Sequence, residues 1–167
     1  MNRPAAILGS ALFLVIAPGT LGVYVPWTFT HWHIGPLLFG MVWLRVAGVV
    51  FIVLGTPVLL ECFVRFAVKG LGTPAPVAAP ERLVISGFYR YVRNPMYVAV
   101  ASIVLGQALL FGSRSLLEYG IFFWLGSFLF VVVYEEPTLR RKFGPEFETY
   151  CANVRRWIPH LHPYAPE

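Results

Sequence analysis

Charged side chains are scarce in this chain, and that scarcity excludes an ordinary water-soluble domain. Only 13% of its 167 residues are charged, against 57% that are hydrophobic, whereas a soluble domain is about one-quarter charged. The mean hydropathy is correspondingly high, at +0.68. So few charges cannot cover a surface that faces water, so lipid is the expected solvent. The length suits one domain over residues 1–167.

Cysteine is equally scarce. Cys62 and Cys151 lie far apart, without a Cys-x-x-Cys pattern or a histidine at ligand spacing. This excludes the usual zinc patterns and a disulfide framework, so we expect free thiols. His31 and His33 form a His-x-His pair, but no third ligand lies nearby, so a polar loop is a simpler interpretation than a metal site.

Acidic residues are outnumbered by basic ones, which leaves a net charge of +5. Such an excess suits either nucleic acid or an anionic lipid surface. The basic residues flank apolar runs, so the pattern indicates membrane lipid as a partner and no nucleic acid.

Apolar runs predict an all-α, polytopic bundle of about four transmembrane helices. Roughly 20 apolar residues span a bilayer. The last two runs are shorter than the first two, and a tight Gly-Ser-Arg-Ser turn joins them, which predicts a helical hairpin. The alternative is a re-entrant hairpin that never crosses. The first run lacks a signal-peptide cleavage site, so we expect it to be retained. The four runs cover residues 5–25, 37–60, 96–111 and 116–134.

The distribution of Lys and Arg predicts the orientation. The loop over residues 24–36 has neither, whereas residues 65–93 and the tail from residue 137 are rich in both. The positive-inside rule then places both termini and the 65–93 segment in the cytosol. Arg45 lies within the second run, where a charge costs about 2.5–3.5 kcal/mol on insertion scales, so it faces a partner or water, or snorkels outward.

An aromatic and basic stretch precedes the third run. Pro95 suits the first residue of a helix, and Asn94 suits its cap. The tyrosines Tyr89 and Tyr97 close to it are consistent with interface anchoring, or with stacking on an adenine ring or a sulfonium.

Two adjacent carboxylates, Glu135 and Glu136, follow the fourth run. Carboxylates at a helix C-terminus oppose its dipole, so they need compensation. Salt bridges to Arg93, Arg140 or Arg141 would supply it, and so would a cationic or hydroxyl-bearing ligand.

Apolar residues recur at spacings of three and four beyond the carboxylates. The spacing predicts amphipathic helices that lie on the membrane or pack back on the bundle, with an interruption at Gly144-Pro145. The apolar positions are Leu139, Phe143, Phe147, Tyr150 and Val154.

Two motifs together resemble the isoprenylcysteine carboxyl methyltransferase family and its relatives among phospholipid methyltransferases. The closing Arg156-Trp157-Ile158-Pro159 is similar to bacterial members, and the resemblance covers residues 70–159. The motifs are Leu83-Val84-x-x-Gly87-x-Tyr89-x-x-x-Arg93-Asn94-Pro95-x-Tyr97, and Glu135-Glu136-x-x-Leu139-x-x-x-Phe143-Gly144-x-x-x-x-x-Tyr150.

The resemblance implies an S-adenosylmethionine-dependent methyltransferase of the bacterial inner membrane, with S-adenosylhomocysteine as product. It also implies a separate opening to the bilayer for a lipophilic methyl acceptor. The residues it implies for the cofactor are Glu81, Arg82, Leu83, Val84, Tyr89, Asn94, Pro95, Met96, Tyr97, Glu135 and Glu136. Gly70-Leu71-Gly72 would supply the Gly-x-Gly element of the phospholipid branch.

One position departs from the family pattern. Val131 replaces an Arg that holds the substrate carboxylate in the eukaryotic enzymes. Arg93 and Arg156 are the candidate catalytic residues in its place, with Arg45 as a further substitute. The acceptor would be lipophilic or small, with an isoprenylcysteine carboxylate as the family default, and a carboxylate needs no general base. The competing hypothesis is a non-catalytic membrane subunit or a small transporter, although no inverted repeat supports the transporter.

Overall fold

The computed structural model describes residues 3–65 and 83–165, and the regular structure in these ranges is helical throughout. This confirms the all-α class. One long helix comprises α1 (Arg3–Gly19), a π-helical segment η1 (Thr20–Tyr24) and α2 (Val25–Thr30). A second comprises α5 (Arg114–Phe130), the π-helical η6 (Val131–Glu135) and α6 (Glu136–Phe143). The other helices are α3 (Trp43–Arg65), α4 (Pro95–Phe111), α7 (Pro145–Asn153) and the 3-10 turns η2 (Leu38–Gly40) and η5 (Gly87–Arg90).

Three helices in the described ranges are long and apolar enough to cross a membrane: Ile7–Thr30, Trp43–Arg65 and Arg114–Phe143. The fourth, α4, has 17 residues and a length of about 25 Å, somewhat less than the roughly 30 Å of a bilayer core. The chain is therefore a helical membrane bundle.

The helices begin and end at different residues from the apolar runs. The second helix begins at Trp43 rather than at residue 37, because Phe39 and Gly40 both adopt positive φ and break the helix before it. Arg45 consequently lies near the start of α3, where its Nη2 donates to the carbonyl of Gly35 at 2.5 Å. This position agrees with the alternative in which the Arg45 side chain snorkels outward from the apolar span.

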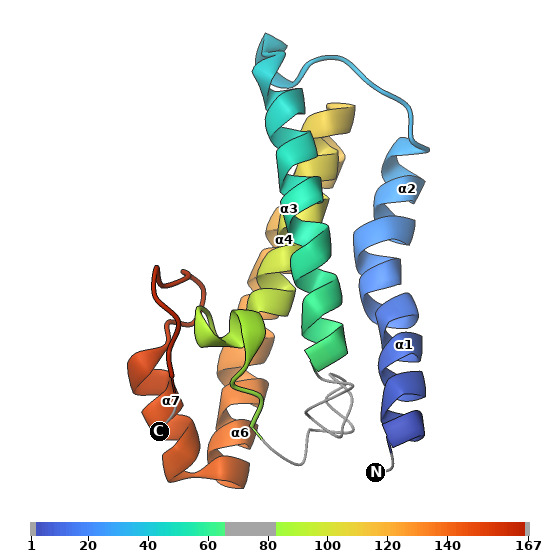
Figure 1. Cartoon of the computed structure of the whole chain (residues 1–167). Helices are drawn as coiled ribbons and strands as arrows, with labels where there is room; N and C mark the ends of the chain where they lie inside the picture. The colour runs from blue at the N-terminus through green and yellow to red at the C-terminus, as the bar shows by residue number, and fades with distance from the viewer. Residues whose placement is uncertain (1–2, 66–82, 166–167) are drawn as a thin grey trace.

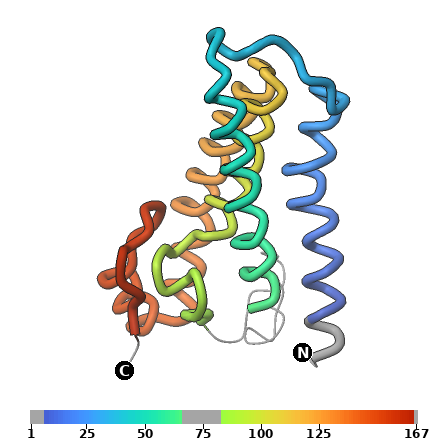
Figure 2. The backbone as a smooth tube through the Cα atoms, turned by 45° about the horizontal axis from the view of Figure 1, so that its top comes forward, coloured from blue at the N-terminus to red at the C-terminus, as the bar shows by residue number. Residues whose placement is uncertain are grey.

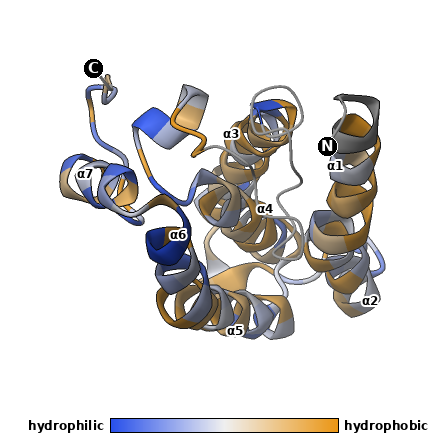
Figure 3. Ribbon diagram, turned by 90° about the horizontal axis from the view of Figure 1, so that it is seen from below, coloured by the Kyte–Doolittle hydropathy of each residue, from blue (hydrophilic) through white to orange (hydrophobic). Residues whose placement is uncertain are grey.

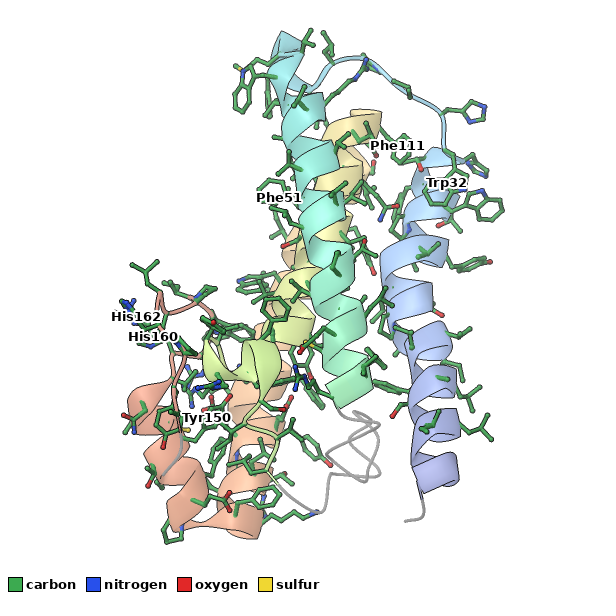
Figure 4. All side chains as sticks on the ribbon, viewed as in Figure 1. Trp32, Phe51, Phe111, Tyr150, His160 and His162 are labelled. Atoms are coloured by element: carbon green, nitrogen blue, oxygen red, sulfur yellow. The ribbon has the colours of Figure 1, made fainter. Side chains whose placement is uncertain are left out.

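The turn between α4 and α5 lies beside the loop after α2, at one end of the bundle (Figure 1). Ser113 caps α5 by accepting from the backbone N–H of Leu116 at 3.2 Å. The Gly35 N–H donates to the carbonyl of Phe111 at 2.8 Å, and Trp32 lies against the Phe111 ring (Figure 4). Helices α4 and α5 are therefore an antiparallel hairpin, as predicted.

Helices α3 and α4 pack side by side along their length, as the tube in Figure 2 shows. Their backbones approach closely at Gly48 and Gly106, because a Cβ on Gly106 would lie 2.6 Å from the carbonyl oxygen of Gly48. Glycine at such crossings lets membrane helices pack by backbone contact.

The π-helical segment of the first long helix is a point of attachment to the bundle. Pro26 has no N–H, so carbonyls one turn earlier lose their helical donor. Gln107 of α4 donates to Gly22 at 2.7 Å, and Tyr119 of α5 donates to Leu21 at 2.9 Å. Side chains from two other helices thus satisfy backbone groups inside the apolar span.

The amphipathic helices α6 and α7 pack together at the opposite end from the hairpin turn. Figure 3 shows a hydrophilic α6 beside a bundle that is mostly hydrophobic. Phe147, Tyr150 and Val154 form a buried cluster with Leu139 and Phe143, and Tyr150 donates its hydroxyl to the carbonyl of Tyr89 at 2.6 Å. The predicted packing back on the bundle is confirmed, and the helix break lies at Gly144.

Candidate functional site

The two predicted carboxylates lie at a second π-helical segment, next to Pro137. Glu135 ends η6 and Glu136 begins α6. Consecutive residues of a helix point in different directions, and these two carboxylates accordingly have different partners. Such π-segments are frequent at functional sites.

Glu136 is buried and electrically compensated. Arg156 forms two hydrogen bonds to it, at 2.7 and 2.8 Å, and Nη1 of Arg93 lies 3.2 Å from its Oε1. Of the predicted compensating residues, only Arg93 pairs with it, because Arg140 pairs instead with Glu148 at 2.7 Å. The candidate catalytic residues Arg93 and Arg156 are therefore brought together, on one carboxylate.

Glu135 has a different environment. Its Oε2 accepts a hydrogen bond from the hydroxyl of Tyr97 at 2.8 Å. Among the described residues, no Lys, Arg or His forms a salt bridge with it. A partly buried carboxylate without a cation is unfavourable unless something else supplies positive charge or further donors.

Asn94 does not cap α4 with its side chain, contrary to the sequence prediction. Its Nδ2 donates instead to the carbonyl of Arg156 at 3.1 Å, because the chain after α7 returns alongside the residues before α4. The Arg93 N–H donates to Arg155, and the His160 N–H donates to Tyr91, at 2.9 and 2.8 Å. Pro95 does occupy the first turn of α4, as predicted.

This returning segment places Trp157 against the site. Its ring centroid lies 4.7 Å from that of Trp124, 6.1 Å from Phe128 and 6.4 Å from Tyr97. Sequence reasoning did not single out Trp157 as a site residue. Its place within the Arg-Trp-Ile-Pro motif was the signal that could have identified it.

The other predicted cofactor residues fall into two groups. Tyr89 and Val84 are buried with Cys62, and Met96 packs against them, whereas Leu83 packs against the α7 cluster. The remaining calls lie outside the described residues: Glu81, Arg82 and the Gly70-Leu71-Gly72 element.

Burial keeps the phenols and the thiol near this site protonated. It raises the pKa of Tyr89 and of Tyr150 well above the usual value. Burial also raises the pKa of Cys151, although Nη1 of Arg93 lies 2.5 Å from its sulfur. The hydrogen bonds to Glu136 raise the pKa of Arg156, so this guanidinium remains charged.

Metal chemistry finds no support within residues 3–65 and 83–165, where no group of three His, Cys, Asp or Glu side chains is placed to hold an ion. Cys62 and Cys151 are free thiols, as predicted. Val131 is fully buried, and an aliphatic side chain offers neither charge nor hydrogen bond to a substrate.

One recess lies beside η5, and another runs along the two helices of the hairpin. A cleft of 570 Å³ is lined by Glu61, Arg65 and η5. An apolar groove of 360 Å³ runs between α4 and α5, and Trp124 belongs to its lining. The groove therefore adjoins the aromatic cluster that contains Tyr97 and Trp157.

Comparison with known proteins identifies the family. The family model described as phospholipid methyltransferase matches residues 43–146, more than half of the chain. No curated protein and no solved structure matches this chain. The matched region includes α3, α4, the aromatic stretch before α4 and the Glu135-Glu136 pair. The chain thus belongs to the phospholipid methyltransferase family of membrane methyltransferases.

Proposed function

We propose that this protein transfers a methyl group from S-adenosylmethionine to a lipophilic acceptor held in the membrane. The observation that carries the proposal is the contrast between the two carboxylates. Glu136 is compensated by two guanidinium groups, whereas Glu135 has only the Tyr97 hydroxyl among the described residues. S-adenosylmethionine offers an ammonium group and ribose hydroxyls, which are the groups that such a carboxylate binds.

The residues around Glu135 suit the rest of such a ligand. Tyr97 fixes one carboxylate oxygen through its hydroxyl, and its ring and that of Trp157 meet edge to face. Aromatic faces stack on adenine and attract a sulfonium. The bound cofactor supplies a methyl carbon activated by positive sulfur. The acceptor's lone pair forms the new bond, while the electrons of the S–CH₃ bond return to sulfur and leave S-adenosylhomocysteine.

For a carboxylate acceptor, the protein's contribution would be alignment and exclusion of water rather than acid–base chemistry, whereas the ammonium group of a phosphatidylethanolamine would first have to lose a proton. Methyl transfer needs donor and acceptor about 3–3.5 Å apart and in line. Glu136, Arg93 and Arg156 hold the segment after α7 against the start of α4, which keeps Trp157 beside Tyr97. Arg93 and Arg156 are both paired with Glu136. In our proposal they therefore position this segment, and they contact an anionic head group of the acceptor only at its edge.

The acceptor that the family resemblance implies is an isoprenylcysteine carboxylate, and a phospholipid head group is the other acceptor to test. We also infer that the end with α6 and α7 faces the cytosol. In support, α1 begins at that end and the basic residues of α6 lie there (Figure 1), as the positive-inside rule requires.

Calorimetric titration of the detergent-purified protein with S-adenosylmethionine tests the role of Glu135. The variant Glu135→Gln should bind about ten- to a hundredfold more weakly, because it loses a charge-assisted interaction. Glu146→Gln is the matched control, since Glu146 is exposed on α7. Equal affinity in wild type and Glu135→Gln would remove Glu135 from the site. A folded wild type without any affinity would favour the non-catalytic subunit.

A further inference from the structure

The α4–α5 groove is suited to one apolar chain. Its volume of 360 Å³ is at the small end of the range for ligand sites, about 300–1,000 Å³. Ser102 contributes the one hydroxyl of its lining, and this hydroxyl already donates to the carbonyl of Val98 at 2.8 Å. No charged side chain lines it. The groove therefore offers mainly dispersion contacts and burial, and beyond Ser102 its one side-chain hydrogen-bonding group is the indole N–H of Trp124.

The groove is accessible from the bilayer. Ile121 and Leu125 on its α5 side are 55% and 51% exposed, and both belong to a helix long enough to cross the membrane. A ligand could therefore enter sideways from the lipid, without passing through water.

One end of the groove is continuous with the candidate site. Val98 and Trp124 line that end, and the ring of Trp157 lies 4.7 Å from that of Trp124. The Tyr97 ring also contacts Trp157, with 6.4 Å between the ring centroids, and its hydroxyl holds Glu135. A molecule lying in the groove would thus reach the Tyr97–Glu135 pair by way of Trp157.

Trp157 carries an unused hydrogen-bond donor at this junction. Its indole Nε1 is buried and has no hydrogen-bond partner among the described residues. A buried N–H without an acceptor is unfavourable, so a ligand oxygen at this position would satisfy it. The rings of Trp124, Phe128 and Tyr97 surround the indole, and none of them accepts a hydrogen bond from its N–H.

We propose that Trp157 is a specificity-determining residue for the methyl acceptor: the apolar chain of the acceptor lies in the α4–α5 groove, and the indole N–H donates to an oxygen of its head group. This assignment rests on the proposed methyltransferase function. The boundary between the apolar chain and the head group of the acceptor then lies at Trp157. The head group consequently lies at the end of the groove nearest Glu135.

Photo-crosslinking tests the groove without relying on activity. The probes are an S-farnesylcysteine and a phosphatidylethanolamine, each with a diazirine in its apolar chain, in nanodiscs of phosphatidylcholine. Gly120 lines the groove, so Gly120→Leu should fill it and lower labelling of α4 and α5 by about tenfold. Gly126→Leu, on the same helix where an added Cβ meets nothing within 4 Å, should label like the wild type.

The two probes distinguish which lipid supplies the apolar chain. The probe that resembles the true acceptor should label the groove, and it should displace the other probe in competition. Labelling that is equal in both glycine variants, or that maps to other helices, would overturn the groove assignment. A copy of this chain occupying the groove would give protein–protein crosslinks there, with the same consequence. Affinity for S-adenosylmethionine, measured on the same samples, reports separately on the proposed function.

Trp157→Phe tests the head-group contact, because phenylalanine keeps a ring and removes the N–H. Affinity for the preferred lipid probe should fall about tenfold, and by more than the affinity for S-adenosylmethionine, because the phenyl ring keeps an aromatic face; the melting temperature should not change. Trp32→Phe, at the other end of the bundle (Figure 4), is the control. Unchanged lipid affinity, or a loss confined to S-adenosylmethionine, would remove Trp157 from acceptor recognition.

Discussion

At the scale of single residues, Glu135 and Glu136 are neighbours with opposite electrostatic surroundings. Two guanidinium groups lie on Glu136, and one phenol lies on Glu135. The sequence predicted that these carboxylates need compensation, and it named Arg93 correctly. It did not indicate that Arg156 would be the closer partner, because that residue follows α7 and is brought back by the turn of the chain rather than by helical spacing.

Removing the charge of Glu136 should destabilise the protein. Glu136→Gln leaves Arg93 partly buried without its carboxylate, and breaking a buried pair in this way costs about 3 kcal/mol or more. Melting in detergent measures the effect. The control is Glu148→Gln, whose pair with Arg140 is exposed and should contribute about 1 kcal/mol or less. Equal melting temperatures for the two variants would contradict the structural role of Glu136.

Asn94 illustrates why side-chain partners are hard to predict from sequence. Asparagine before Pro95 is typical of a helix cap, and α4 does begin there. The carbonyl of Arg156 nevertheless takes the amide, a contact between residues far apart in the chain. Local pattern therefore predicted the position of the helix start but not the bond that the side chain makes.

At the scale of helices, composition predicted that four apolar segments exist, and the structure changes their bounds. Both long helices extend beyond the predicted runs, through π-helical segments that precede Pro26 and Pro137. A proline usually signals a helix end, so the prediction stopped early. The freed carbonyls near Pro26 are satisfied by Gln107 and Tyr119, which lie on other helices and are invisible to local pattern.

Gln107→Leu should weaken the attachment of the first long helix. The substitution removes the donor to the Gly22 carbonyl within the apolar span, and an interhelical hydrogen bond of this kind contributes about 1 kcal/mol. Unfolding by denaturing detergent provides the measurement. Thr56→Val is the control, since the Thr56 hydroxyl bonds only within its own helix. A loss in Thr56→Val as large as in Gln107→Leu would contradict this interhelical role.

Gly106→Leu should separate α3 from α4. A Cβ on Gly106 would meet the Gly48 backbone at 2.6 Å, and backbone cannot move as a flexible side chain can. Overpacking of this kind costs about 2 kcal/mol, to be read from the melting temperature. Gly126→Leu provides the comparison, because its Cβ meets nothing within 4 Å. If Gly106→Leu melts with the wild type, the close crossing is not needed for stability.

At the scale of the whole molecule, the bundle has two unlike ends. One carries the hairpin turn and the loop after α2, and the other carries α6 and α7 (Figure 1), with the two carboxylates at the junction of η6 and α6. The sequence predicted this division from the distribution of Lys and Arg. It could not predict that the segment after α7 would bring Trp157 against α4 and α5, because that depends on tertiary contacts.

The two ends should differ in accessibility in intact cells. Ile34→Cys, at an exposed loop position, should react with a membrane-impermeant maleimide from outside. Leu161→Cys, which is 93% exposed at the other end, should react only after permeabilisation. Cys62 is buried, and burial raises the pKa of Cys151, so both native thiols should react slowly near neutral pH. Labelling of Leu161→Cys in intact cells would reverse the proposed orientation.

The most direct test of the central claim is methyl transfer itself. The purified protein in nanodiscs receives S-adenosylmethionine with a tritiated methyl group, together with phosphatidylethanolamine or S-farnesylcysteine, and radioactivity in the lipid fraction is counted. We predict label in one of these lipids with wild type and Glu146→Gln, and a loss with Glu135→Gln. A folded wild type that leaves both lipids unlabelled, and that binds neither these lipids nor S-adenosylmethionine, would contradict the proposal.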